Sequence, residues 1–317
     1  MILAFELKYE SLCVLGYLSS LLIRKFAPMS EIAVQKPAIW KIYLIFTKFR
    51  LSFLVILSAL SGYLFAGGSD YLEITYLMLG GTLVTAASNG ANQIWERELD
   101  VLMSRTKNRP LPQGWMTVKE AYIVCIISLI LGTLLLLQLN LYSALLGLLA
   151  FLTYVFVYTP LKLKTPWAVF VGAFPGAIPP MLGYIAESND FTLHSGVLFF
   201  VQFTWQFPHF WAIAWVLYDD YKKAGFSLLP SASGRSKQSA FQIMVYSLFL
   251  IPFSLLPWAL EWVGISTLVI ASLLGIVFFV YAYRLFMYCE TKDARKLMFA
   301  SFVYLPIIQF VYVFDKL

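Results

Sequence analysis

Charge is scarce in this chain. Only 13% of its 317 residues are charged, whereas 60% are hydrophobic. A soluble domain of this length is about one-quarter charged and about half apolar. No part of the sequence has the composition of a soluble domain, which excludes a water-soluble globular protein. In a membrane protein the net charge of +6 is informative about membrane topology and phosphate binding. We expect no nucleic-acid partner.

Cysteine and histidine are also rare. The three cysteines, Cys13, Cys125 and Cys289, are too few and too widely spaced for a disulfide framework or a thiolate metal cluster. The two histidines are His194 and His209. A metal site in this chain would have to rely mainly on oxygen-bearing side chains.

Long apolar runs are abundant. Runs of roughly 18 or more apolar residues can cross a bilayer as helices, because a helix satisfies its own backbone hydrogen bonds in lipid. We predict an all-α polytopic membrane bundle with about nine transmembrane helices. The predicted spans are Leu51–Ala66, Tyr71–Asn89, Ala121–Leu139, Tyr142–Val157, Trp167–Ile185, Gly196–Leu217, Phe241–Leu260, Ile265–Arg284 and Leu297–Phe314.

The loops between these spans alternate in charge. Lys and Arg gather near residues 41–50, 97–119, 162–164, 222–237 and 292–296, and the intervening loops have almost none. The positive-inside rule places the basic loops in the cytoplasm. This predicts a bacterial-type inner membrane protein with its N-terminus in the cytoplasm and its C-terminus outside.

The N-terminal segment is predicted to differ from the rest. Residues 1–40 would form a cytoplasmic or interfacial segment, and residues 41–317 a single transmembrane domain. The apolar run Ser11–Ile23 is only about 13 residues long, which favours an interfacial helix over a span. We expect no cleavable signal peptide. Met29 is an alternative start of translation.

One charged stretch stands out, SNGANQIWERELDVLMSRTKNRPLPQG, at residues 88–114. Asn92, Glu96 and Asp100 recur at intervals of four, so on a helix they form one stripe about 12 Å long. Their oxygen atoms suit Mg²⁺, which commonly takes one or two carboxylates together with substrate phosphate. A solvated helix end is the alternative. The metal site is favoured because the stripe begins inside an apolar helix, where polar residues tend to be functional.

Basic residues follow this stripe directly. Arg105, Lys107 and Arg109 could meet phosphate oxygens, and arginine does so with two parallel hydrogen bonds. The stretch is therefore predicted to hold a metal ion and a diphosphate between acids and bases. Further candidate phosphate ligands, for which positive-inside charge is the alternative, are Lys48, Arg50, Lys162 and Lys164.

The motif N-x-x-x-E-x-x-x-D followed by M-x-R-T-x-x-R-P resembles the first signature of the UbiA-type intramembrane prenyltransferases, and in particular their protoheme IX farnesyltransferase branch. The resemblance extends from about residue 40 to the C-terminus. It includes FTKFRLSFLVILSALSGYLFA, YTPLKLKTPWAVFVGAFPGAIPPMLGY, WQFPHFWAIAWVLYDDYKKAGFSLLP and YLPIIQF.

This resemblance implies a UbiA-type prenyltransferase fold and a Mg²⁺-dependent enzyme. The reaction would transfer farnesyl from farnesyl diphosphate to a vinyl group of heme B, giving heme O and diphosphate. The implied partners are these two substrates and the lipid bilayer, with a heme A-forming oxidase as a further one. The implied catalytic residues are Asn92, Glu96, Asp100, Arg105, Arg109 and Asp220, of which Glu96, Asp100 and Asp220 would bind the metal.

The sequence departs from the family pattern at two of these positions. Glu96 stands where Asp is more usual. Many relatives have a second D-x-x-x-D, but here Asp219 and Asp220 are adjacent and Lys223 replaces a later acid. Adjacent residues on a helix point about 100° apart, so one of the two faces the site, and we predict Asp220. The neighbouring candidates for substrate binding are Tyr221, Lys222 and Lys223.

His209 lies within the sixth predicted span and is the last candidate for substrate binding. A buried histidine is often only a hydrogen-bonded core residue. In a protein that holds heme it could ligate the iron or contact a propionate. His194 is predicted to lie on the outer surface.

Other functions remain open on this pattern. A sibling prenyltransferase could act on a quinone precursor or another aromatic acceptor, but the R-T-x-x-R-P and P-H-F segments favour heme. A secondary transporter would place its ionisable groups near the bilayer midplane and not at one membrane face. A passive heme-binding or assembly subunit would not need the spaced acids.

Overall fold

The computed structural model describes residues 36–317, with the backbone alone for Arg50. The chain divides into two compact units, Met1–Pro37 and Ala38–Leu317, and the second contains nearly all of the described residues. The predictions for Ser11–Ile23, for Met29 and for most of segment 1–40 lie outside the described residues.

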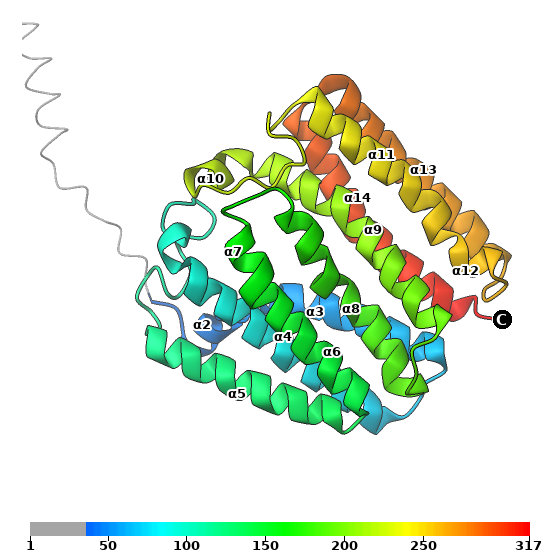
Figure 1. Cartoon of the computed structure of the whole chain (residues 1–317), viewed down its shortest axis with the longest axis horizontal. Helices are drawn as coiled ribbons and strands as arrows, with labels where there is room; N and C mark the ends of the chain where they lie inside the picture. The colour runs from blue at the N-terminus through cyan, green and yellow to red at the C-terminus, as the bar shows by residue number, and fades with distance from the viewer. Residues whose placement is uncertain (1–35) are drawn as a thin grey trace, which may run out of the picture. The chain divides into compact units, whose positions relative to one another are not determined.

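The described part is all-α (Figure 1). Its helices are α2 (Ile39–Phe46), α3 (Phe49–Ala66), α4 (Tyr71–Asp100), α5 (Val118–Leu137), α6 (Leu141–Leu152), the π-helix η1 (Thr153–Tyr158), α7 (Thr159–Leu161), α8 (Ala168–Ser188), α9 (Leu193–Val216), α10 (Tyr218–Lys223), α11 (Lys237–Ser254), α12 (Leu256–Ala259), α13 (Ile265–Tyr288) and α14 (Thr291–Phe314).

The predicted spans coincide with long helical segments of the described region. Six of these helical segments are long and apolar enough to cross a membrane. The number is seven if α2 and the segment Leu51–Ala66, whose axes meet at 57°, together form one span. Helices α4 and α9 are not among the six; both have polar residues in otherwise apolar segments. The all-α membrane bundle is therefore confirmed, and the count of nine crossings stays a prediction.

Side-chain caps fix where several helices begin. Asp70 accepts hydrogen bonds from the backbone N–H groups of Leu72 (2.7 Å) and Glu73 (3.1 Å) at the start of α4. Thr117 and Glu120 form a reciprocal capping box at the start of α5. Such caps satisfy backbone donors that the first helical turn leaves free. The long charged loop 101–117 thus lies between a helix that ends at Asp100 and a firmly capped helix start.

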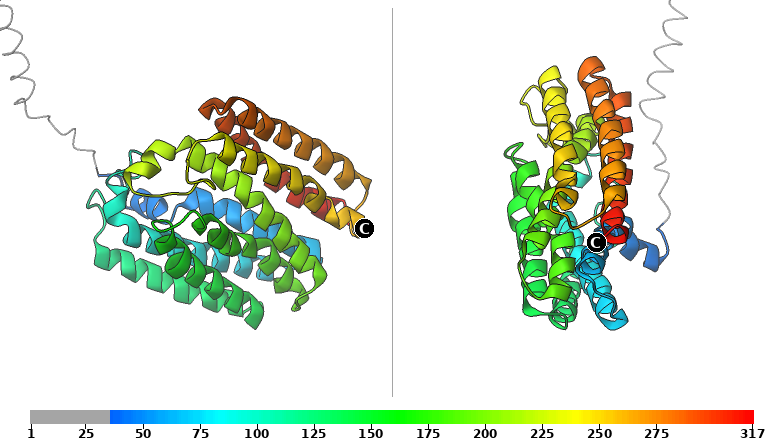
Figure 2. Two further views of the ribbon diagram at one scale, coloured as in Figure 1. Left: turned by 45° about the horizontal axis from the view of Figure 1, so that its top comes forward. Right: turned by 90° about the vertical axis from the view of Figure 1, so that its right-hand side faces the viewer.

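Helices α3, α4, α6, α8, α9 and α14 surround one cavity, and α11 and α13 pack on the outside of α9 and α14 (Figure 1). The two charged loops, after α4 and around α10, lie at the same end of the bundle (Figure 2). The functional polar groups predicted from the sequence are therefore concentrated at one end.

A close crossing of α3 and α8 holds the middle of this bundle together. A Cβ atom at Gly183 would lie 1.8 Å from the carbonyl oxygen of Ala59, and one at Gly62 would lie 1.9 Å from that of Pro180. Only glycine lets the two backbones approach so closely, as is common where helices pack in membranes. The crossing brings the cavity-lining faces of both helices together.

The π-helix η1 interrupts the run from α6 to α7. Its wide turns are rare and occur frequently at functional sites. The next residue after it, Thr159, is buried against α4. The irregular turn therefore lies directly beside the predicted site.

We expect Gly183→Ala to destabilise the protein by about 1–3 kcal/mol, as overpacking of a tight contact typically does. Gly196→Ala is the control, because a Cβ atom there meets nothing within 4 Å. Thermal unfolding of the two variants in the same detergent micelles measures the difference. Equal midpoints would contradict the close crossing.

Candidate active site

The predicted oxygen stripe lies on the last turns of α4 and is buried. The exposed fractions of Asn92, Glu96 and Asp100 are 2%, 6% and 0%. Buried carboxylates are strongly unfavourable unless they are paired. Their burial shows that these are not residues of a solvated helix end.

Each carboxylate has a basic partner from a neighbouring loop. Glu96 forms an ion pair with Lys162, which follows α7 and is itself 7% exposed. The Nη1 atom of Arg109 lies 2.8 and 2.7 Å from the two carboxylate oxygens of Asp100. The acids and bases of the prediction thus lie together, with the bases drawn from two different loops.

Asn92 connects the stripe to two further elements. Its Oδ1 accepts a hydrogen bond from Lys48 Nζ at 3.4 Å, and its Nδ2 donates to Thr159 Oγ1 at 3.2 Å. Thr159 in turn donates to the carbonyl oxygen of Tyr154 at 2.9 Å, within the π-helix. The amide of Asn92 is therefore held in one orientation from both sides.

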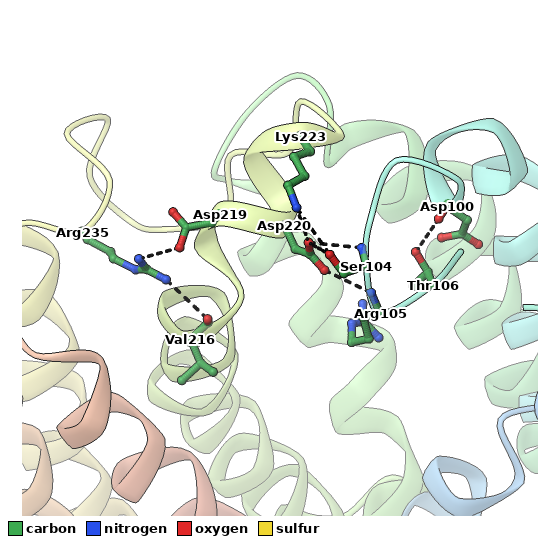
Figure 3. A network of polar contacts seen from close by, with 9 residues as sticks. All are labelled: Asp100, Ser104, Arg105, Thr106, Val216, Asp219, Asp220, Lys223 and Arg235. Carbon is green, nitrogen blue, oxygen red and sulfur yellow. Dashed lines mark hydrogen bonds and ion pairs between the residues drawn. The ribbon is translucent and has the colours of Figure 1, made fainter. Parts of the chain in front are cut away.

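Asp220 holds the loop 101–117 against α10 (Figure 3). Its Oδ1 accepts hydrogen bonds from the N–H (3.2 Å) and the hydroxyl (2.9 Å) of Ser104, and its Oδ2 from the N–H of Arg105 (3.2 Å). Lys223 Nζ lies 3.1 Å from the same carboxylate. Burial opposes ionisation of Asp220, but these hydrogen bonds outweigh it and lower its pKa to about 2.

Asp219 points away from that loop (Figure 3). It forms an ion pair of 2.9 Å with Arg235, whose Nε donates to the carbonyl oxygen of Trp215 at 2.7 Å. Of the two adjacent acids, Asp220 is therefore the one that contacts the first charged loop.

A largely apolar cavity of about 280 Å³ lies inside the bundle. Its lining includes Ser88 and Asn89, one turn before Asn92 on α4, and Tyr158, next to Thr159. The opposite wall, on α9, contributes His209 and other polar residues. The buried charges therefore lie at the end of a chamber that could hold a long apolar chain.

The profile of the UbiA prenyltransferase family matches residues 55–304, which is most of the chain. The chain belongs to the UbiA prenyltransferase family. Membership, together with the apolar helices, makes it an integral membrane enzyme and decides against the transporter and the passive subunit.

Relatives in this family are similar over nearly their whole length. A protoheme IX farnesyltransferase of Cytophaga hutchinsonii is 49% identical over 278 residues, which cover 87% of this chain and 97% of the relative. One of Christiangramia forsetii is 47% identical, covering 85% of this chain and 91% of the relative.

Solved structures of the family have the same fold. A structure described as digeranylgeranylglyceryl phosphate synthase superposes with a TM-score of 0.73 at 21% identity, covering 87% of this chain and 98% of the other. A UbiA homologue of Archaeoglobus fulgidus, bound to GPP and Mg²⁺, gives 0.62 at 16% identity, with coverages of 86% and 99%.

Not every predicted residue lies in the buried group. The side chains of Arg105, Lys107, Lys164 and Lys222 are exposed, and that of Arg50 is outside the described structure. Within residues 36–317 no three acidic, histidine or cysteine side chains form a metal cluster. The predicted triad of Glu96, Asp100 and Asp220 is therefore not brought together, because Asp220 binds the loop backbone.

Sequence reasoning also missed residues that the site uses. Thr159 is hydrogen-bonded to Asn92, and Ser104 to Asp220. A single hydroxyl residue belongs to no spacing pattern, so the sequence does not reveal such a role. Ser301, which contacts His209, is more than ninety residues away from it in the sequence.

We expect Asp220→Asn to increase backbone hydrogen exchange at Ser104 and Arg105 by about ten-fold or more, since each hydrogen bond to a charged group contributes about 1.5–3 kcal/mol. Asp219→Asn is the matched control, because Asp219 contacts Arg235 instead. Exchange measured by mass spectrometry in micelles reports both. Equal protection in the two variants would refute this tether, by which Asp220 holds loop 101–117 against α10.

The same tether has a predictable pH dependence. Because the folded-state pKa of Asp220 is lowered from 3.8 to about 2, its contribution is fully present above pH of about 4 and is lost as pH falls through about 2. Protection of Ser104 and Arg105, corrected for intrinsic exchange rates, should decline only in this window. A decline centred at or above pH of about 5 would assign the tether to another group.

Proposed function

We propose that the chain transfers a farnesyl group from farnesyl diphosphate to a vinyl group of heme B, forming heme O and releasing diphosphate. The observation that supports this most directly is the buried acid–base group of α4 at the end of the apolar cavity. The names of the relatives, protoheme IX farnesyltransferases at up to 49% identity, favour heme as the acceptor.

The diphosphate binds at the charged end. Lys48, Arg109 and Lys162 already lie around Asn92, Asp100 and Glu96. Cations in a site shielded from water stabilise charge that develops on a leaving group far better than they do in solution. Arg105, Lys107, Lys222 and Lys223 form an outer basic rim that attracts the incoming diphosphate.

The residues present fit a magnesium ion that is bound together with its substrate. Glu96 and Asp100 are one helical turn apart, with the Asn92 amide one turn earlier, and all three offer the oxygen donors that Mg²⁺ prefers. Two carboxylates are sufficient when substrate phosphate completes the shell. When bound, the ion would neutralise the charge of the departing diphosphate. A fold relative has been solved with GPP and Mg²⁺.

Binding would exchange partners within the site. In the structure Lys162 and Arg109 neutralise Glu96 and Asp100. With substrate and metal bound, we expect the bases to turn toward phosphate and the carboxylates toward the ion. Each carboxylate has a cationic partner in both arrangements, so neither state leaves a buried acid unpaired.

The farnesyl chain lies in the apolar cavity below this site. Walls of Leu54, Val84, Ile178 and Leu182 exclude water from the allylic carbon as the C–O bond to diphosphate breaks. The terminal vinyl carbon of heme forms the new C–C bond there. Water then adds to the neighbouring carbon and loses a proton, which completes the hydroxyethylfarnesyl group.

The site faces the cytoplasm in this proposal, with the chain in a bacterial-type inner membrane, its N-terminus inside and its C-terminus outside. The basic loops lie at one end of the bundle, which agrees with the positive-inside rule. A heme A-forming oxidase is the proposed downstream partner, since it would consume the product.

We expect Glu96→Gln and, separately, Asp100→Asn to lower prenyl transfer by about 100-fold or more, the size of effect seen when one charge-stabilising group is removed. Membranes with each variant are incubated with heme B, farnesyl diphosphate and Mg²⁺. The masses of the extracted hemes are then measured by mass spectrometry. The product is heavier than heme B by one farnesyl group plus one hydroxyl group.

Glu98→Gln is the control for these variants, because Glu98 lies on the same helix but its side chain is 83% exposed. It should keep near-normal turnover. Normal turnover in both Glu96→Gln and Asp100→Asn would reject the proposed roles. Transfer of farnesyl to a quinone precursor, with heme B unchanged by intact wild-type protein, would assign the sibling reaction instead.

A further inference from the structure

Three glutamines are buried among the apolar helices. Gln202 and Gln206 on α9 line the cavity, and Gln309 on α14 contacts Gln202. Their exposed fractions are 5%, 2% and 6%. Polar side chains inside a membrane bundle are costly and tend to be functional. The hydrogen-bond partners of each amide group therefore indicate what it does.

Gln202 and Gln309 have structural partners. Pro180 has no N–H, so it leaves the carbonyl oxygen of Gly176 without its helical donor, and Gln202 Nε2 donates to that oxygen at 2.6 Å. Gln202 Oε1 accepts from Gln309 Nε2 at 2.7 Å, and Gln309 Oε1 accepts from Ser58 Oγ at 3.0 Å. The amide oxygens of both glutamines are therefore used in joining α3, α8, α9 and α14.

Gln206 differs because its amide oxygen has no donor. Its Nε2 donates to the carbonyl oxygen of Ala173 at 2.9 Å and lies 3.4 Å from that of Gln202. Both neighbours can only accept, so the nitrogen must face them and Oε1 must face the other way. From the described atoms of residues 36–317 Oε1 receives no hydrogen bond, yet it is not among the unpartnered atoms that this part of the chain encloses completely. The oxygen therefore reaches the wall of the cavity that Gln206 lines.

Gly176 leaves room for this oxygen. It lies on α8 and lines the same cavity, and a Cβ atom there would lie 2.1 Å from Gln206 Oε1. Any side chain at position 176 would therefore displace the amide oxygen. Helices α8 and α9 thus hold one hydrogen-bond acceptor in a wall that is largely apolar.

A buried acceptor requires a donor, and the participants in the proposed reaction restrict the choice. The farnesyl chain and the heme vinyl groups have no N–H or O–H, and ionised propionates and diphosphate only accept. Water is the participant that donates. The reaction consumes one water after the new C–C bond has placed a positive charge on the vinyl carbon next to the porphyrin.

We propose that Gln206 Oε1 binds and orients the water that completes the hydroxyethylfarnesyl group. This inference rests on the proposed function, because only that reaction adds water at the vinyl carbon. One O–H of the water donates to Gln206 Oε1, and a lone pair of its oxygen faces the cationic carbon. The C–O bond forms, and the proton of the resulting oxonium passes to the released diphosphate, which is a base near neutral pH.

The position of Gln206 also protects the first step. The allylic cation forms where diphosphate leaves, at the end of the cavity that Ser88 and Asn89 of α4 line, whereas Gln206 belongs to the α9 wall. A water hydrogen-bonded at that wall must give up this bond to reach the allylic carbon. It is therefore kept for the second cation, and farnesyl is not lost to hydrolysis.

The test is the ratio of two products. Without an oriented water, the cationic vinyl carbon is neutralised when the neighbouring CH₂ group loses a proton to diphosphate. This gives a conjugated alkene, lighter than the hydroxylated heme by one water. Membranes with wild type or Gln206→Leu are incubated with heme B, farnesyl diphosphate and Mg²⁺, and both hemes are measured by mass spectrometry. We expect the ratio of hydroxylated to dehydrated product to fall by about ten-fold, as for the loss of one neutral hydrogen bond.

Three further variants separate this role from packing. Gln206→Glu should restore the ratio, since a protonated glutamic acid donates its O–H to Ala173 and keeps a carbonyl oxygen at the cavity. Gly176→Ala should lower the ratio although Gln206 is retained, because its Cβ displaces Oε1. Thr204→Val is the matched control and should keep the wild-type ratio. Thr204 is also buried on α9, but its hydroxyl donates to the carbonyl oxygen of Phe200 and it is not part of the cavity lining.

The outcomes distinguish this inference from the proposed function. An unchanged ratio in Gln206→Leu, with the wild type forming hydroxylated heme, would overturn the water site only. Loss of both products in intact Gln206→Leu would also overturn it, since the water acts only after the C–C bond has formed. Gln206→Met, with a side chain of similar length, replaces Gln206→Leu if that variant does not fold. An intact wild type that forms neither product from heme B would overturn the proposed acceptor and this inference with it.

Discussion

The pairing of two buried carboxylates with bases from distant loops is the constraint on which the charged end of the bundle depends. Removing one partner of a buried ion pair costs about 3–5 kcal/mol. Glu96 therefore needs Lys162, and Asp100 needs Arg109. Because these bases lie beyond α7 and within the loop after α4, the pairs also determine where both loops fold. The acids thus assemble the cations around themselves before any phosphate is present.

This arrangement divides the bundle into two regions with different chemistry. Charge is confined to one end, where the loops after α4, α7 and α9 meet. The interior is an apolar chamber whose walls come from helices that cross closely, as α3 and α8 do at Gly62 and Gly183. A reaction that separates a diphosphate from a hydrocarbon cation requires both regions side by side. On α9 the cavity lining has few polar side chains, which are Gln202, Gln206 and His209.

The sequence predicted the parts of this site that regular geometry determines. An interval of four residues places Asn92, Glu96 and Asp100 on one helix face whatever surrounds them. The 100° between adjacent residues also separated Asp220 from Asp219. Ion pairs such as Glu96–Lys162 depend on how helices dock, which no local pattern encodes. The hydroxyl of Ser301 was missed for the same reason, since it meets His209 only across two packed helices.

The π-helix has a consequence for comparing this chain with others. One wide turn accommodates about one additional residue, and a shift of one residue rotates everything after it by about 100° around the helix axis. Residues 153–158 therefore set the direction in which Thr159 and Lys162 face. An alignment that treats residues 141–161 as one uninterrupted α-helix would turn both side chains away from α4. Matching positions in a relative without this turn requires a one-residue gap within this helical run.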